Sequence, residues 1–135
     1  MPSTINISNG FNKEEFKGLA VDAYLVSKCS VKRFIAEKEF VYGYKKERQD
    51  GSLSDKFATL MILRSHPALI LHIGKKPEKK GLELQMEVDK KLGKSYERNE
   101  VQINEKPHET FIRLDWVNEL EDIKEFIDEV FEKRS

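Results

Sequence analysis

This sequence has a single cysteine, no long apolar run and no excess of charge of either sign. Because Cys29 is the only cysteine, the chain can form no internal disulfide and no zinc site built from several thiolates. A lone thiol is typical of a reducing compartment, and we expect a cytoplasmic location. No window approaches the ~20 apolar residues that a membrane-spanning helix needs, and the first residues lack the pattern of a secretion signal. The sequence therefore predicts neither membrane insertion nor secretion.

The charges cancel across the chain. It has 24 basic and 24 acidic residues, so the protein as a whole has no electrostatic preference for polyanions. Charged residues nevertheless make up 36% of the 135 residues, which is typical of a heavily solvated surface. A chain of this length can bury one hydrophobic core without disulfides or metals. We expect a single domain over residues 1–135, in which any nucleic-acid function depends on a local basic patch.

Residues that usually mark catalytic or metal sites are sparse. The seven glycines form no cluster after an apolar run, so no standard phosphate-binding loop is predicted. His66, His72 and His108 lack the i+3 or i+4 spacing that places two imidazoles on one metal ion. We interpret His72 as a half-buried sheet residue rather than a catalytic base, and Cys29 as a buried thiol. The sequence therefore predicts no catalytic residue, no metal and no cofactor.

Three short runs at the centre of the chain predict an antiparallel sheet. Residues 40–44, 57–63 and 68–73 are rich in the aromatic and β-branched side chains that favour strands. Residues 45–55 are polar and contain Asp-Gly, which predicts a long charged loop. A short turn with proline at residues 64–67 connects the two more apolar runs.

Further strands are predicted downstream. Residues 82–89 alternate strictly between apolar and polar side chains, which favours a half-exposed strand. Residues 101–103 predict a short strand and residues 110–114 the last one, while residues 90–98 predict a loop.

The N-terminal part of the chain predicts helical structure. Asn12 and Glu15 have the spacing of a capping box, and an apolar stripe with helical spacing continues to about residue 37. The stretch from Ser27 to Ser30 has lower helix propensity, so one helix and two helices, the second capped by Ser30, are both compatible with the pattern.

The C-terminal part predicts a helix as well. Asn118 and Glu121 have the spacing of a capping box, and an uninterrupted apolar stripe runs from Val117 to Phe131. Taken together, the runs predict an α+β fold with an antiparallel sheet of four to five strands and N- and C-terminal helices packed on one face.

One local group of residues joins aromatic rings to basic side chains. Between residues 28 and 48, seven basic residues stand against three acidic ones. Exposed tyrosines beside a basic rim are how several sheet domains stack single-stranded bases and hold the phosphates. The alternative is that the tyrosines face the core and the lysines only solvate a loop. The candidate nucleic-acid-binding residues are Tyr42, Tyr44, Lys45, Lys46, Arg48 and Lys38.

The order of the apolar runs resembles that of a group of small bacterial domains. The likeness is to the YjbR/MmcQ-like family and to a related uncharacterised domain at the C-terminal end of nuclease-associated proteins. It implies a compact α+β domain in which helices cover an antiparallel sheet, in some relatives an association with DNA-related proteins, and no catalytic residue. The segments that carry it are Phe40-Val-Tyr-Gly-Tyr-Lys45, Lys56-Phe-Ala-Thr-Leu60, Leu69-Ile-Leu-His-Ile73, Phe111-Ile-Arg-Leu-Asp115 and Glu121-Asp-Ile-Lys-Glu-Phe-Ile127.

The second face of the sheet is where the sequence places a binding function. Residues 57–63 and 68–73 are apolar on both strand faces, and helices can cover only one of them, so a homodimer through the second face is one prediction. A protein partner and a nucleic acid are the other candidates. The sequence thus favours a non-catalytic binding domain. The competing interpretation is a small enzyme or ligand-binding protein whose site is assembled from residues distant in sequence.

Overall fold

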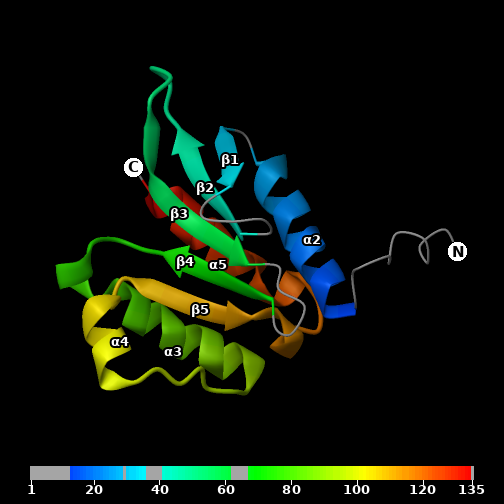
Figure 1. Cartoon of the computed structure of the whole chain (residues 1–135), viewed down its shortest axis with the longest axis vertical. Coiled ribbons are helices and arrows are strands. Elements are labelled where there is room, and N and C mark those ends of the chain that lie inside the picture. Colours follow the sequence, from blue (N-terminus) through cyan, green and yellow to red (C-terminus); the bar gives the residue numbers. More distant parts are fainter. Residues whose placement is uncertain (1–12, 29, 36–40, 62–66, 135) are drawn as a thin grey trace, which may run out of the picture.

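The chain has an α+β fold with an antiparallel sheet, described here from a computed structural model (Figure 1). The structure describes residues 13–28, 30–35, 41–61 and 67–134. Within these residues, five strands pair in the order β1-β2-β3-β4-β5, each antiparallel to the next. The strands are β1 (Val31–Ile35), β2 (Val41–Glu47), β3 (Leu53–Met61), β4 (Ala68–His72) and β5 (Glu109–Arg113). The helices are α2 (Lys13–Ser27), α3 (Lys80–Leu92), α4 (Glu100–Glu105) and α5 (Glu121–Lys133), with short 3-10 helices η1 (Lys76–Glu78) and η2 (Leu114–Trp116).

Helices α2 and α5 pack on one face of the sheet, called here the first face, and α3 packs beside β5 at its edge. In Figure 1, α5 passes behind strands β3 and β4. Residues directly opposite in an antiparallel pair point to the same face, so the pairing defines rows of side chains. Two rows turn their side chains toward the helices and form the centre of the core: Tyr42, Leu60, Leu69 and Ile112, then Tyr44, Ala58, Leu71 and Thr110. The predicted helix arrangement is confirmed.

The second face carries the side chains that alternate with these rows. Its central row is Gly43, Thr59, Ile70 and Phe111, followed by the pair His72 and Glu109. Polar groups therefore lie at the middle of this face, and β4 is less apolar on its second side than the sequence suggested.

Residues 31–35 form a strand where the sequence predicted helix. Ser30 has a φ of 66°, a left-handed conformation that stops the helical path after α2. The β-branched and aromatic side chains of Val31, Phe34 and Ile35 then favour the extended conformation, and β1 pairs with β2. The helical spacing of these residues was real, but strand pairing outweighed it.

The charged loop predicted at residues 45–55 is a tight hairpin. Strand β2 runs on to Glu47 and β3 begins at Leu53, so only residues 48–52 form the turn. Arg48 N donates to Ser52 O at 2.8 Å, and Gly51 takes a φ of 88° that glycine adopts without strain. Of the charged residues that suggested a loop, Arg48 and Asp50 lie in the turn, whereas Lys45, Lys46 and Glu47 belong to β2 and Asp55 belongs to β3.

Two segments predicted as strands are helices. Residues 82–89 belong to α3, which buries Leu84, Gln85 and Val88 along one stripe and leaves Met86 73% exposed. Residues 101–103 belong to α4, whose start is a capping box between Asn99 and Gln102.

Of the remaining predictions, some are confirmed, one is wrong and others lie outside the described residues. The last strand and the C-terminal helix are confirmed as β5 and α5, but α5 begins after Leu120 and has no capping box at Asn118. Phe40, the N-cap proposed at Asn12 and most of the predicted turn at residues 64–67 lie outside the described residues.

The outer edge of β5 is closed by a side chain. Gln85 of α3 donates to Phe111 O at 2.9 Å and accepts from Phe111 N at 2.8 Å, as a neighbouring strand would. Nearby, Gly81 lies so close to the backbone of Glu109 that an added Cβ would collide with it. Strand β5 is thereby blocked from pairing with another chain.

Replacing Gln85 is expected to destabilise the fold. The Gln85→Leu variant leaves the N–H and C=O of Phe111 without their partners, at a cost of about 1–3 kcal/mol. Urea unfolding measures this change. Met86→Leu is the matched control on the exposed side of α3 and is expected to stay within about 0.5 kcal/mol of wild type. Equal stability of the two variants would contradict a role for Gln85 at the edge.

Candidate functional site

The sequence-predicted binding residues do not share one surface. Tyr44 is fully buried on the first face, and its hydroxyl donates to Asp22 Oδ1 of α2 at 2.6 Å. Burial, together with this hydrogen bond, raises the pKa of Tyr44. Tyr42 is half-buried on the same face, with the Arg33 guanidinium 5.3 Å from its ring centroid. The tyrosines thus follow the alternative interpretation, in which they belong to the core side.

Two of the predicted basic residues hold the fold together. Lys46 Nζ donates to Phe131 O and Arg134 O, both at 3.0 Å, and so satisfies carbonyl groups at the end of α5. Arg48 Nη1 donates to Leu53 O at 2.8 Å across the hairpin. Lys38 lies outside the described residues.

Lys45 lies on the second face, in a row that the sequence could not show. It is opposite Lys32 of β1 on one side and Lys56 of β3 on the other. The register between β2 and β3 shifts on both sides of Lys45, and the shift between Ala58 and Lys56 turns Lys56 to the second face although Ala58 points to the first. We call Lys32, Lys45 and Lys56 the lysine row. None of the three forms an ion pair with another described residue, and Glu47, the next residue of β2 on this side, is at the end of the strand.

An aromatic ring lies beside the lysine row. Phe34 of β1 is opposite Gly43, and its ring covers the glycine so closely that an added Cβ would collide with it. The ring remains 36% exposed, and Lys45 Nζ lies 5.3 Å from its centroid. Glycine at position 43 is therefore what allows a flat ring on this part of the second face.

The other end of the second face carries an aromatic cluster around β5. Phe111 stacks on Tyr96 with ring centroids 5.1 Å apart, and Tyr96 meets Trp116 edge-on at 6.2 Å. Arg98 lies over Phe111, and Arg113 lies over Trp116. A cavity of about 360 Å³ opens beside Tyr96, Arg98 and Phe111. Its lining also includes Glu97, Gln102, Glu105, Lys106 and Glu109.

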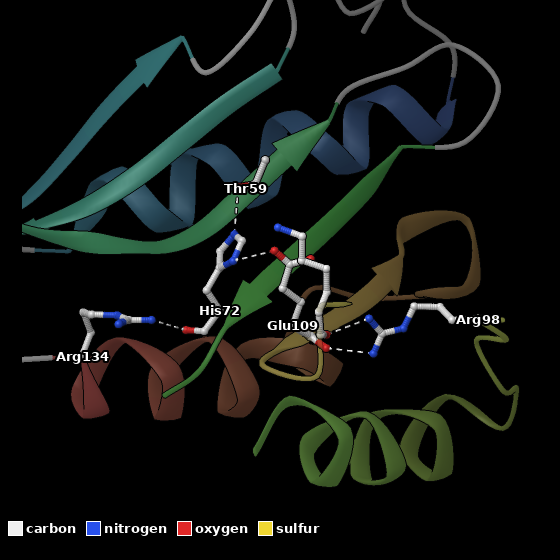
Figure 2. A network of polar contacts seen from close by, with 6 residues as sticks. Thr59, His72, Arg98, Glu109 and Arg134 are labelled. Carbon is white, nitrogen blue, oxygen red and sulfur yellow. Dashed lines mark hydrogen bonds and ion pairs between the residues drawn. The ribbon is translucent and has the colours of Figure 1, made fainter. Parts of the chain in front are cut away.

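A chain of polar side chains crosses the middle of the second face (Figure 2). His72 Nε2 lies 2.9 Å from Thr59 Oγ1, and His72 Nδ1 lies 3.2 Å from Glu109 Oε2. Because an ionised carboxylate only accepts hydrogen bonds, Nδ1 carries the proton, and in the neutral ring Nε2 accepts from the Thr59 hydroxyl. Thr59, His72 and Glu109 are 7%, 9% and 9% exposed. Arg98 Nη2 donates to the backbone oxygen of Glu109 at 3.1 Å.

The order of hydroxyl, imidazole and carboxylate is that of a hydrolase triad, but the surroundings favour a structural function. The Thr59 hydroxyl lies in a buried layer, only 7% exposed, rather than at a surface that a substrate reaches. His72 lies in β4 and is 9% exposed, so it is a sheet residue that is more buried than the predicted half-buried position. His66 and Cys29 lie outside the described residues.

The Glu109 carboxylate makes stability depend on pH. Burial alone would raise its pKa, but the hydrogen bond and charge of His72 outweigh burial and lower the pKa below the ordinary 4.5. A carboxylate with a lowered pKa in the folded state stabilises the fold above its unfolded pKa, and this contribution is lost as the pH falls through the folded value.

We therefore expect wild type to lose, on acidification below about pH 5, a stabilisation that the Glu109→Gln variant does not have. Urea unfolding at neutral and acidic pH measures it. The stability gap between the two proteins is expected to narrow as the pH falls. A gap that stays constant would contradict an ionised Glu109 in the folded protein.

Sequence reasoning missed most of the second-face residues because their grouping depends on strand pairing. Lys32 and Lys45 belong to two consecutive strands, and only the β1–β2 register places them opposite each other. The Lys-Arg-Phe order of β1 is a usable signal, but the apolar spacing around it predicts a helix. No helix in the described part of the chain is long and apolar enough to cross a membrane. The sequence matches no protein-family model, no curated protein and no solved structure.

Proposed function

We propose that this chain is a non-catalytic cytoplasmic binding domain that holds a single-stranded nucleic acid on the second face of its sheet. The lysine row is the observation that carries the proposal. Of the binding residues predicted from the sequence, the proposed site contains Lys45. Its other members are Lys32, Lys56 and Phe34, and it does not contain Tyr42, Tyr44, Lys46 or Arg48.

Charge supports a polyanion as the ligand. Like charges directly opposite each other in a sheet are destabilising, and here two such pairs share Lys45. No described acidic residue forms an ion pair with the row. A chain of phosphates laid across the three strands would remove this repulsion, because neighbouring strands lie about 4.8 Å apart and each lysine side chain can reach its own phosphate.

The aromatic residues support a single strand over a duplex. Unpaired bases expose their faces and stack on rings presented by a sheet, whereas paired bases do not. Phe34 presents an exposed ring beside the lysines. The cluster of Tyr96, Phe111 and Trp116 lies at the opposite side of the sheet, four strand spacings or about 19 Å from β1. A strand of at least about four nucleotides, the lower end of known site sizes, would span this distance.

The competing occupants of this face are a second copy of the chain and a protein partner. Large obligate protein interfaces are mainly apolar, whereas the centre of this face is formed by the polar side chains of Thr59, His72 and Glu109. The second face therefore fits a protein partner or a second copy less well than the lysine row fits phosphate. The resemblance to YjbR/MmcQ-like domains stays a prediction, and its association with DNA-related proteins agrees in kind with this proposal.

Fluorescence anisotropy with labelled single-stranded DNA and RNA and a matched duplex tests the proposal. We expect single strands to bind more tightly than the duplex, with an affinity that falls with salt at a slope of about −0.7 per phosphate contacted. Equal binding of single strand, duplex and an unrelated polyanion would remove the base-stacking part of the proposal. Absence of binding at low salt would overturn it.

A further inference from the structure

The two edges of the sheet differ. The edge of β5 is occupied by Gln85 and by Arg98, which take up the backbone groups of Phe111 and the oxygen of Glu109. At the other edge, β1 pairs with β2 and with no other described strand, and four of its five residues are exposed. Within the described residues, no hydrogen bond joins an outward backbone N–H or C=O of β1 to another backbone group. Among the residues that the structure describes, one edge is therefore closed and the outward backbone groups of the other have no partner.

The pairing with β2 determines which groups of β1 point outward. Glu47 N donates to Ser30 O at 2.7 Å, so this pair is a hydrogen-bonded one, and such pairs alternate along an antiparallel ladder. Lys32 and Phe34 then direct their N–H and C=O groups toward β2. The N–H and C=O groups of Val31, Arg33 and Ile35 point outward, which gives three donors and three acceptors at regular spacing.

We propose that β1 pairs with β1 of a second copy, antiparallel and with Arg33 at the two-fold axis. In this register Arg33 faces Arg33 of the partner subunit, and Val31 faces Ile35 of the partner subunit, so every outward N–H and C=O of both strands is bonded. Ile35, 66% exposed in one copy, gains an apolar neighbour. On the second face, Lys32 lies opposite Phe34 of the partner subunit, a favourable cation–ring pair.

The charge at the centre of this pairing is compensated. Arg33 Nη1 forms an ion pair with Asp22 Oδ2 of α2 at 2.7 Å, so the two arginines that meet at the axis each bring their own carboxylate. The contact involves only five residues per strand, which is small for a protein interface. The dimer therefore forms weakly and its population depends on protein concentration.

The pairing would also extend the proposed ligand site. Two sheets joined at β1 place their lysine rows and their Phe34 rings on one continuous face. This consequence rests on the proposed function, whereas the pairing itself does not. A dimer is then expected to bind a strand about twice as long as the shortest one bound by a monomer.

Ile35→Pro tests the pairing. Proline removes only an outward N–H at this position, so the bonds to β2 are kept while one bond per strand at the new interface is lost. Sedimentation equilibrium over a wide concentration range is expected to show a monomer–dimer equilibrium for wild type, and a dissociation constant raised at least about tenfold for the variant. Ile35→Val is the matched control and is expected to dimerise like wild type. A purely monomeric wild type, or dimerisation unchanged by Ile35→Pro, overturns the proposal.

A cysteine placed at the axis tests the register. In a Cys29→Ser background, Arg33→Cys places two thiols opposite each other, within the Cα separation of about 7 Å that a disulfide tolerates. Lys32→Cys is the control, because its copies are diagonal neighbours about 7–8 Å apart. Mild oxidation is expected to link the first variant much faster than the second. Equal rates contradict this register.

The two proposals fail separately. Ile35→Pro is expected to lose dimerisation while a monomer still binds a short single strand. Reversal of charge at Lys45 and Lys56, which are absent from the edge, is expected to lose nucleic-acid binding and to keep dimerisation. Dimerisation without nucleic-acid binding in wild type would overturn the proposed function and leave the pairing in place.

Discussion

Reversing the charge of the lysine row by Lys32→Glu, Lys45→Glu and Lys56→Glu together is expected to lower the affinity for a single-stranded oligonucleotide at least about a hundredfold. Each charged hydrogen bond to a phosphate contributes about 1 kcal/mol or more, and the loss of three corresponds to at least two factors of ten. The new carboxylates add repulsion. The slope of log K against log salt concentration is also expected to become shallower by about 2, because three phosphate contacts at about 0.7 each are lost. Anisotropy titrations at several salt concentrations measure both effects.

The matched control changes the net charge by the same amount elsewhere. Lys75, Lys76 and Lys79 are exposed lysines in and beside η1, away from the lysine row. Their reversal is expected to change affinity only through the weak field of the whole protein. If both triple variants bind equally well, or equally poorly, the lysine row is not the binding site. Thermal unfolding of each variant establishes that the fold is kept.

The largest effect on stability is expected from His72→Leu. This change leaves the Glu109 carboxylate buried without its partner and also removes the acceptor for the Thr59 hydroxyl. Leaving a buried carboxylate without its hydrogen-bond donor costs about 3 kcal/mol, because the remaining charge stays desolvated. Urea unfolding at neutral pH measures this loss, which is a large fraction of the 5–15 kcal/mol typical of a whole domain.

A double variant distinguishes the cost of leaving Glu109 unpaired from the cost of poor packing by the new leucine. In His72→Leu with Glu109→Met, both polar partners are replaced by apolar side chains of similar size, and most of the lost stability is expected to return. This recovery would show that the network is structural. A His72→Leu protein as stable as wild type would contradict this interpretation and would reopen the enzyme alternative, in which Thr59, His72 and Glu109 act on a substrate.

Local sequence patterns correctly predicted the elements in which the apolar positions of the sequence are the positions that are buried in the structure. Strand β4 is a short apolar run that becomes buried, and α5 carries an apolar stripe that faces the sheet. In α3 the apolar alternation of residues 82–89 was misleading, since Met86 faces solvent and a polar residue, Gln85, takes a buried position. Gln85 is buried because it bonds the edge of β5, a reason that lies in another element.

The candidate site was less predictable than the fold because successive side chains of a strand point to opposite faces of the sheet. Tyr44 and Lys46 point to the first face, while Lys45 between them points to the second, so a group of residues that looks continuous in sequence is divided between two surfaces. The other residues of the proposed site come from β1 and β3. Because the sequence predicted a helix for residues 31–35, it did not predict strand β1.

The sequence by itself determined the α+β class, the absence of an internal disulfide, and the local excess of basic residues before the hairpin. These follow from composition and from spacing within single elements. Only the tertiary structure decided that Lys32, Lys45 and Lys56 form one row, that Thr59, His72 and Glu109 meet, and that one sheet edge is closed while the other is not. The physical reason is that a strand exposes its side chains with a period of two and acquires its neighbours by register, and the register is determined by packing between segments far apart in the chain.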